Sequence, residues 1–479
     1  MGNIKKGIIW TSGEKLFTQL VQFILGIIIA RIISPQEYGV LGIIMVFINV
    51  AEVFVDSGMG SALIYRNNLD KKDTQTTFSF NLIVSLIFYV LLFVASTFIE
   101  EFLKLNSLAV YLRVASLVLI FNSFIIVPIS ILKVKQNFKA ISLSNITSTV
   151  LSGILGVIMA YRGYGVWALI YQLLFRSILS VLLINIQCRW LPHFTFYKES
   201  FKGLWKYSAN LLTLNSFTKF VEEGLAFIIG KSLTPYNLGL YTRGLQFSSF
   251  PNGFISSVLS TVMFPALSSS RNDELLFYNT YRKTIILQSI FIPPIYLGLV
   301  IISKPLVFLL LGEKWMSVVP VLLILCLGKL LFTFANTTEN VLYSLGHTHI
   351  SLKQQMYKML VKLLLVLFAL RWGFIAVVIA NALADFSAYF IINYCGREYL
   401  VYSLKKQLKD IYIYILASIF SGVVGYIVGS FISNPILNII VVITISVLIY
   451  IFLLYLFVIL LHKNCEKKHS LYNINSILI

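Results

Sequence analysis

Long apolar runs alternate with short polar segments along almost the whole chain. A helix needs about 20 predominantly apolar residues to cross the hydrocarbon core of a membrane, whereas a transmembrane β-barrel shows short segments of alternating polarity. The continuous runs therefore predict an all-α polytopic membrane protein. Fourteen spans fit the pattern: residues 8–31, 39–64, 78–99, 108–131, 143–161, 165–187, 204–230, 237–267, 284–303, 318–345, 356–371, 373–396, 410–432 and 436–461.

The apolar pattern also repeats at an offset of 200 residues. Phe17–Gly39 aligns without gaps with Phe217–Gly239, and eight of the 23 aligned positions are identical. Each copy carries six spans, so both copies enter the membrane from the same face, as parallel repeats do, and such duplicated membrane proteins are often transporters. The pattern predicts a six-helix lobe over residues 1–200, a second over 201–400, and two further helices with a tail over 401–479.

The composition agrees with a membrane protein. Hydrophobic residues make up 58% of the 479 residues, charged residues 12%, and the mean hydropathy is +0.86, which excludes a water-soluble globular protein. The net charge of +19 indicates orientation rather than nucleic-acid binding, because cytoplasmic loops are rich in Lys and Arg. Of the 38 basic residues, 25 lie on the side of the two termini and 7 on the opposite side. We therefore expect cytoplasmic termini.

Nothing in the sequence indicates an enzyme. The segments between spans are short, and no GxGxxG, P-loop, HExxH, CxxC or GxSxG pattern is present. The four cysteines, Cys188, Cys326, Cys395 and Cys465, have no metal-ligand spacing. We expect a non-enzymatic protein that works among its helices, without a bound metal or cofactor.

Basic residues inside the spans are candidates for function, since an ionisable group in the membrane is costly unless it faces a partner or a wet cavity. Lys219, near the middle of its span, either contacts an anionic ligand or pairs with Glu222 and Glu223 one turn along the helix. Arg113 and Arg243 either guide an anion outwards or reach the interface, and Lys15 is either a ligand contact or part of a solvated helix end. The candidate anion-binding set is Lys219, Arg243, Arg176, Lys329, Arg113 and Lys15.

Carboxylates inside the spans are candidates for coupling to a cation. Glu52 and Asp56 are four residues apart on one helix face, where two carboxylates repel and one tends to hold a proton. The Asp56-Ser57-Gly58 stretch is equally typical of a helix break. Asp385 lies in the repeat-equivalent neighbourhood of Arg176, which indicates either a structural pair of opposite charges or a shared substrate contact. The candidate coupling set is Glu222, Glu223, Asp56, Glu52 and Asp385.

Basic groups around a cavity between two helical lobes predict a substrate with concentrated negative charge. Phosphate fits best, because Arg offers forked donors and Lys offers a point charge. Aromatic residues make up 14% of the chain, and most of them are typical of an interfacial belt, although their faces also suit sugar rings.

Several stretches resemble polysaccharide flippases of the Wzx type, especially the colanic-acid-type exporters. The first half carries ARIISPQEYG at Ala30–Gly39 and DSGMGSALI at Asp56–Ile64. The second half carries LGLYTR at Leu238–Arg243, MFPALS at Met263–Ser268 and LLGEKW at Leu310–Trp315. The similarity covers roughly residues 1–400.

The resemblance implies the multidrug/oligosaccharidyl-lipid/polysaccharide exporter (MOP) fold, with two six-helix lobes around a central cavity. It also implies an undecaprenyl-diphosphate-linked oligosaccharide as substrate, a bacterial cytoplasmic membrane as location, and an H⁺ or Na⁺ gradient as driving force. By matching position, Arg243 falls on the family's Tyr-x-Arg signature and Lys219 on a basic position of the seventh helix. Where many relatives carry an Asn-Ala-Asp-like stretch, this chain has Val221-Glu222-Glu223-Gly224.

We therefore expect an alternating-access flippase that works as a monomer, near polysaccharide polymerases and glycosyltransferases. A multidrug antiporter of the same fold is one alternative, but its cavity would be acidic and aromatic to hold organic cations, unlike the central Lys219, Arg176 and Lys329. A membrane glycosyltransferase would need a large external loop or a catalytic acidic motif, and neither is present. A lipid II flippase shares the mechanism and stays open as an alternative.

Overall fold

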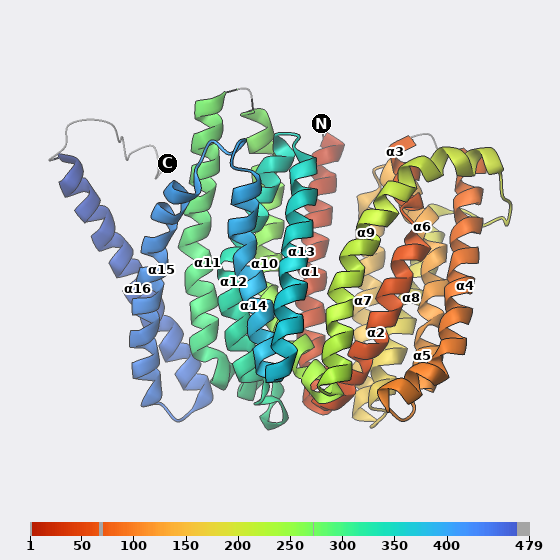
Figure 1. The fold of residues 1–479 in the computed structure, drawn as a ribbon, viewed down its shortest axis with the longest axis horizontal. Helices are drawn as coiled ribbons and strands as arrows, with labels where there is room; N and C mark the ends of the chain where they lie inside the picture. The colour runs from red at the N-terminus through yellow and green to blue at the C-terminus, as the bar shows by residue number, and fades with distance from the viewer. Residues whose placement is uncertain (1, 67–69, 272, 467–479) are drawn as a thin grey trace. The chain divides into compact units, whose positions relative to one another are not determined.

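The computed structural model describes residues 2–66, 70–271 and 273–466, and those residues form helices joined by short connections (Figure 1). This confirms the predicted all-α class. The first helices are α1 (Gly2–Ile32), α2 (Pro35–Asp56), α3 (Met59–Arg66), α4 (Lys71–Leu103), α5 (Leu108–Ala115), α6 (Leu117–Val134), α7 (Phe138–Tyr161), α8 (Val166–Cys188) and α9 (Lys198–Ser232). They are followed by α10 (Pro235–Ser269), α11 (Glu274–Leu311), α12 (Val318–Ser344), α13 (Thr348–Ala369), α14 (Phe374–Cys395), α15 (Leu404–Ser430) and α16 (Pro435–Glu466).

The helices follow the predicted spans in order. The pairs α2–α3 and α5–α6 each cover one predicted span, so the described residues form fourteen helical segments. Eleven of these segments are long and apolar enough to cross a membrane. The three segments outside that group are α9, α10 and α13, and α9 carries Lys219, Glu222 and Glu223 near its middle. Helix α9 is thus among the more polar segments, and it also carries more candidate site residues than any other helix.

The repeated Ser/Thr-Pro motif begins a helix in both copies. Ser34 caps α2, since its hydroxyl accepts from the Glu37 backbone N–H at 3.3 Å while the Glu37 carboxylate accepts from the Ser34 N–H at 2.8 Å. Thr234 stands in the same place before α10, where its hydroxyl accepts from the Asn237 N–H at 3.2 Å. Proline at the first helical position costs no hydrogen bond, which explains why the motif suits both sites.

Two compact units divide the chain, Met1–Thr242 (unit 1) and Arg243–Ile479 (unit 2). In unit 1, α1 packs on α7, α7 on α8, and α2 on α9. In unit 2, α12 and α13 pack on α14, while α15 packs on α11 and α16. Because α9 packs on α2, it belongs with unit 1, although it opens the second repeat of the sequence. The predicted division at residues 200 and 400 follows the repeat and stays a prediction.

The two repeat copies touch each other reciprocally inside unit 1. A Cβ atom added to Gly39 would lie 1.7 Å from the carbonyl oxygen of Pro235, and one added to Gly239 would lie 1.8 Å from that of Pro35. Only glycine allows backbones to approach so closely. The glycine shared by the two copies is therefore needed where the start of α2 crosses the start of α10.

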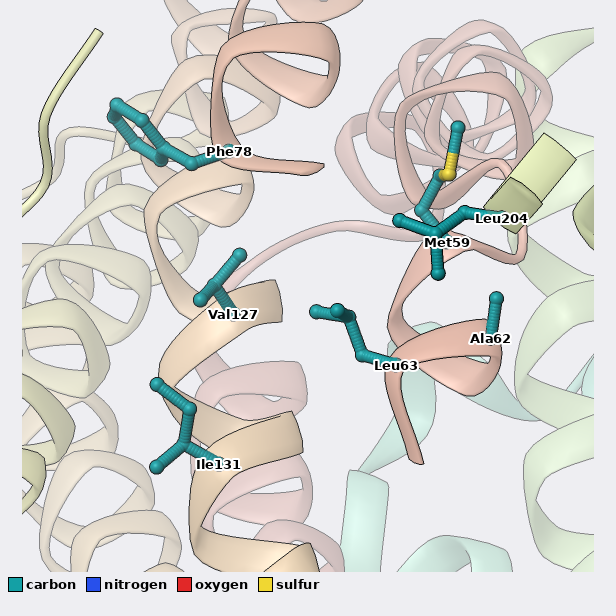
Figure 2. Packing of buried hydrophobic residues seen from close by; sticks show 7 residues of the cluster. All are labelled: Met59, Ala62, Leu63, Phe78, Val127, Ile131 and Leu204. Atoms are coloured by element: carbon teal, nitrogen blue, oxygen red, sulfur yellow. The ribbon is translucent and has the colours of Figure 1, made fainter. Parts of the chain in front are cut away.

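A hydrophobic cluster holds the short helix α3 in unit 1 (Figure 2). It joins α3 to α4, α6 and the beginning of α9, and its buried members are Met59, Ala62, Leu63, Phe78, Val127, Ile131 and Leu204. Just before α3, the chain breaks at Ser57 and Gly58, which have left-handed backbone conformations with φ of 46° and 71°. The alternative that Asp56-Ser57-Gly58 marks a helix break therefore agrees with the structure.

Candidate functional site

Lys219 lies beside two carboxylates on its own helix, α9. Its Nζ is 3.4 Å from Oε2 of Glu222 and 3.9 Å from Oε1 of Glu223. The Lys219 and Glu222 side chains are 42% and 46% exposed, whereas that of Glu223 is 13% exposed. The predicted ion pair is thus present, but it is loose and open on one side, so it leaves the ammonium accessible to a ligand.

Three glutamates of unit 1 each accept a hydrogen bond from an asparagine on a neighbouring helix. Neutral amides satisfy these carboxylates as acceptors but do not compensate their charge. The donor and acceptor pairs are Asn145 to Glu14 at 3.1 Å, Asn122 to Glu52 at 2.7 Å, and Asn49 to Glu223 at 2.9 Å. Ser177 of α8 in turn donates to Asn122 at 2.5 Å, which fixes the orientation of the amide that faces Glu52.

Glu52 is where the polar groups of α2, α6 and α9 meet. Lys219 lies near enough to Glu52 to interact with it electrostatically, and Asp56 adds like charge one turn further along α2. Asp56 is exposed and directly precedes the helix break. The structure therefore brings four predicted site residues, Lys219, Glu223, Glu52 and Asp56, into one region of unit 1.

Arg176 belongs to a second group in unit 1, between α1 and α8. With the Gln22 amide turned so that its oxygen faces the guanidinium, Gln22 accepts from both terminal nitrogens of Arg176, at 2.9 and 3.2 Å. Glu14 interacts with Arg176 electrostatically. Arg176 is exposed on α8, next to Ser177, which is buried. It thus lies close to the Glu52 network along α8.

Two further basic candidates of unit 1 have simpler surroundings. Arg113 donates to the hydroxyls of Ser96 and Thr97, both at 2.8 Å, and its guanidinium stacks on the Phe93 ring, 4.6 Å from the centroid. These contacts favour the interfacial alternative for Arg113. Lys15 is exposed on α1.

Unit 2 contains a buried ion pair. Lys329 Nζ on α12 lies 2.7 Å from Oδ2 of Asp385 on α14, and the two side chains are only 11% and 9% exposed. The helices approach closely here, since a Cβ atom added to Gly328 would lie 2.6 Å from the backbone oxygen of Ala382. Asp385, which the sequence allowed us to pair with Arg176, therefore has a cationic partner within its own unit.

Two more residues of unit 2 have unusual surroundings. Asn381, one turn before Asp385, is 1% exposed, and neither polar atom of its side chain has a hydrogen-bond partner among the described residues. Arg243, at the start of unit 2, is buried, donates to the Gln246 side chain, and lies 5.9 Å from the centroid of the Trp315 ring. The Arg243 and Trp315 contact links two of the stretches on which the sequence resemblance rests.

The partners of the charged residues were missed at the sequence level. Asn49, Asn122 and Asn145 are neutral, so a search for ionisable groups passes over them. A usable signal was present in α2, because Asn49, Glu52 and Asp56 recur at intervals of three and four residues on one helix face. The donors on α6 and α7 gave no such signal.

These observations define a polytopic helical membrane protein with two charged regions among its helices. A family model described as polysaccharide biosynthesis protein matches residues 28–320, more than half of the chain, and the chain belongs to this family.

Relatives and solved structures agree with the family. The succinoglycan biosynthesis transport protein ExoT of Rhizobium meliloti is 24% identical over 72% of this chain and 69% of its own. The lipopolysaccharide biosynthesis protein WzxC of Escherichia coli is 25% identical over 69% and 68%. The lipid II flippase MurJ, in an inward closed conformation, superposes with a TM-score of 0.75 at 18% identity, covering 94% of this chain and 98% of its own. The predicted family and MOP fold are confirmed.

Proposed function

We propose that this protein is a flippase that moves an undecaprenyl-diphosphate-linked oligosaccharide from the inner to the outer leaflet of a bacterial cytoplasmic membrane. The proposal is supported by the family match and by relatives named for succinoglycan and lipopolysaccharide biosynthesis. On this proposal the chain acts as a monomer without covalent chemistry, both termini are cytoplasmic, and polymerases and glycosyltransferases work nearby.

The accessible ammonium of Lys219 is the observation that carries the substrate assignment. A diphosphate needs cationic partners that are held in place but not fully neutralised. Lys219 meets this need because it is about half exposed and its two carboxylates lie at 3.4 and 3.9 Å. Arg176 offers a second, forked donor in the same unit.

Coupling to a cation gradient is assigned to the carboxylates of unit 1. Glu52 accepts a hydrogen bond from an asparagine, and an amide cannot supply the positive charge that a proton or Na⁺ brings. Glu223 also accepts from an asparagine, and its contact with Lys219 is long, at 3.9 Å. Asp385 is a weaker candidate because Lys329 already compensates it at 2.7 Å. H⁺ or Na⁺ binding at Glu52 would change the charge that faces Lys219, which connects the cation to the substrate site.

Deletion and complementation test the substrate assignment. In a strain without redundant flippases, deletion should make undecaprenyl-diphosphate oligosaccharide accumulate on the cytoplasmic leaflet while surface glycan is lost. Wild type and Lys219→Arg should restore surface glycan, and Lys219→Ala should leave it at least about tenfold lower, since the charge is lost. Normal surface glycan after deletion, with no lipid-linked intermediate, would overturn the proposal and direct attention to drug efflux.

Two matched carboxylate variants test the coupling assignment. Glu52→Gln keeps an oxygen that accepts from Asn122 but removes the charge, so the fold should persist while transport loses its dependence on the H⁺ or Na⁺ gradient. Asp385→Asn is the control in unit 2, and its transport, where the variant folds, should keep the gradient dependence. If Glu52→Gln transports with unchanged gradient dependence, Glu52 is not the coupling residue.

A further inference from the structure

The segment that joins the two repeats exposes an unusual amount of apolar and aromatic surface. After α8, residues 190–197 run without helix to the start of α9. Leu191, Phe194 and Phe196 are 75%, 65% and 50% exposed. Figure 1 shows the first turns of α9 running across the ends of neighbouring helices before α9 turns to follow α2. We call residues Arg189–Lys206 the connector.

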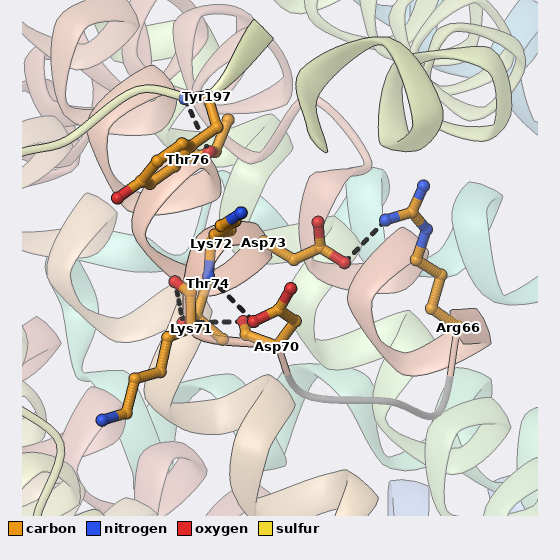
Figure 3. Close-up of polar contacts among 8 residues, drawn as sticks. All are labelled: Arg66, Asp70, Lys71, Lys72, Asp73, Thr74, Thr76 and Tyr197. Atoms are coloured by element: carbon orange, nitrogen blue, oxygen red, sulfur yellow. Dashed lines mark hydrogen bonds and ion pairs between the residues drawn. The ribbon is translucent and has the colours of Figure 1, made fainter. Parts of the chain in front are cut away.

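Hydrogen bonds fix the connector to the first three turns of α4. Ser79 donates to the Thr195 carbonyl at 2.9 Å, Thr195 donates to the Gln75 side chain at 2.8 Å, and the Tyr197 backbone N–H donates to the Thr76 hydroxyl at 3.1 Å. Figure 3 shows the last of these bonds beside Lys72 and Asp73. Helix α4 is a candidate span of 33 residues, longer than the about 20 residues that cross the hydrocarbon core. Its first turns, and the connector bonded to them, therefore lie toward one end of that span, where we expect the membrane interface.

Aromatic packing fixes the inner face of the connector as well. Phe201 and Trp205 stack on each other at 5.4 Å and both contact Phe80 of α4, at 5.1 and 5.7 Å between ring centroids. Trp190 packs edge-on against Phe78 at 5.5 Å. These contacts hold the connector in one orientation against α4. The side of α9's first turns that faces away from α4 is therefore fixed as well.

That outer face carries a row of lysines. Lys198, Lys202 and Lys206 are spaced four residues apart, so they lie along one side of the helix, and all three are exposed. Exposed Arg189, Lys71 and Lys72 lie on the neighbouring segments. No carboxylate of the described residues forms an ion pair with any of these six side chains.

The carboxylates nearest to the row already have other contacts. Asp73 pairs with Arg66 at 2.6 Å, and Asp70 accepts from the Lys72 backbone N–H as the cap of α4 (Figure 3). Within the connector, Glu199 is the only acidic residue beside four basic ones. The surface thus combines uncompensated positive charge with exposed aromatic side chains at one end of a candidate membrane span.

We propose that the connector is a binding surface for anionic phospholipid headgroups. Phe194, Phe196 and Leu191 enter the boundary between headgroups and acyl chains, while Lys198, Lys202 and Lys206 contact phosphates. Amphipathic segments with this distribution lie in the plane of the interface, and each surface lysine adds attraction to an anionic leaflet. The proposal is independent of the transported substrate.

Lipid titration of the purified full-length protein tests the surface. Phosphatidylglycerol is added at rising mole fraction to detergent micelles, with phosphatidylcholine as the uncharged comparison, and the melting temperature is recorded because a bound lipid stabilises the folded state. The triple variant Lys198→Gln, Lys202→Gln, Lys206→Gln should need at least about tenfold more phosphatidylglycerol for half of the stabilisation. Its response to phosphatidylcholine should equal that of wild type.

Two matched variants distinguish lipid binding at the connector from a non-specific effect of lowering the protein's net charge. The triple variant Lys405→Gln, Lys406→Gln, Lys409→Gln removes the same charge from exposed positions at the start of α15 and should respond like wild type. The triple variant Lys198→Arg, Lys202→Arg, Lys206→Arg, which keeps the charge, should also respond like wild type. The proposal would be overturned if both glutamine variants needed equally more phosphatidylglycerol, or if the connector variant needed no more than wild type. Competition by soluble inorganic phosphate would overturn it too, since a free-phosphate site would then explain the binding.

Discussion

The two units treat their intramembrane charges differently. In unit 1, Glu14, Glu52 and Glu223 each accept from a neutral asparagine, and Lys219 stays about half exposed. In unit 2, Asp385 is buried against Lys329 at 2.7 Å. In a further ion pair of unit 2, Arg282 lies 2.6 Å from Asp410, and Asp410 also accepts a hydrogen bond from the Tyr402 hydroxyl. Burial raises the pKa of Tyr402, as does its bond to Asp410, so its phenol stays a donor there.

The carboxylates of unit 1 that have amide partners stay available to a cation, whereas Asp385 of unit 2 is already compensated by Lys329. A half-buried carboxylate next to an amide gains no compensating charge from that amide and is stabilised by any cation that reaches it. A buried ion pair has no such need, and removing one member leaves the other unpaired at high cost. The comparison therefore favours unit 1 as the working region and unit 2's pair as a structural contact between α12 and α14.

The largest effect should come from breaking the pair of unit 2. Asp385→Ala leaves Lys329 buried without a partner, and we expect the free energy of unfolding in detergent to fall by about 3–5 kcal/mol. The double variant Lys329→Met, Asp385→Leu removes both charges and should recover most of that loss. A single variant as stable as the double would show that the pair is not buried from solvent, and the comparison between units would fail.

The contact between the repeat copies should give the next largest effect. Gly39→Ala and Gly239→Ala each place a methyl group within 2 Å of a proline carbonyl oxygen, so the backbones must separate. We expect each variant to lose up to about 3 kcal/mol of unfolding free energy. The two losses should be about equal.

Gly13→Ala is the control for these two variants, since an added Cβ there meets no atom within 4 Å. It should be neutral or slightly stabilising, because alanine favours a helix over glycine by roughly 1 kcal/mol. A loss confined to one of the two crossing glycines would contradict the reciprocal contact.

Local sequence predicted the helices and their starts better than it predicted the partners of the charges. Ser34-Pro35 and Thr234-Pro235 begin α2 and α10 because capping depends on neighbours in the sequence. Lys329 and Asp385 are 56 residues apart on separate helices, so their contact depends on how α12 and α14 align. No periodicity in either helix determines that alignment.

The same limit explains the candidate site of unit 1. The i, i+3 and i+4 spacing of Lys219, Glu222 and Glu223 was readable from the sequence, and the structure has both contacts. The Asn122 contact to Glu52 spans 70 residues and requires α6 to face α2. Residues whose chemistry depends on packing between helices could be named as candidates, but their partners could not.

Removing an amide partner should cost less than breaking the pair of unit 2. Asn122→Ala takes the donor away from Glu52, and Asn49→Ala takes it away from Glu223. We expect losses of about 1–2 kcal/mol in unfolding free energy for each, since a half-buried carboxylate can recruit water. Asn122→Asp is a sharper variant, because it places a second carboxylate beside Glu52. The stability that it loses should return at lower pH, where protonation of one carboxylate removes the repulsion. Equal stability of Asn122→Asp across pH would contradict the Glu52 contact.

The smallest effect on stability should come from Lys219, and this contrast links the comparison to function. Lys219 and Glu222 lie on one helix and are both about half exposed, and the contact with Glu223 is long at 3.9 Å, so Lys219→Ala should change the free energy of unfolding by less than about 1 kcal/mol. The melting curve in detergent should therefore overlay that of wild type, while surface glycan falls. If Lys219→Ala destabilises the protein as much as Asp385→Ala does, Lys219 is a structural partner like Lys329. Its loss of transport would then follow from misfolding, and the reason to place a diphosphate beside it would disappear.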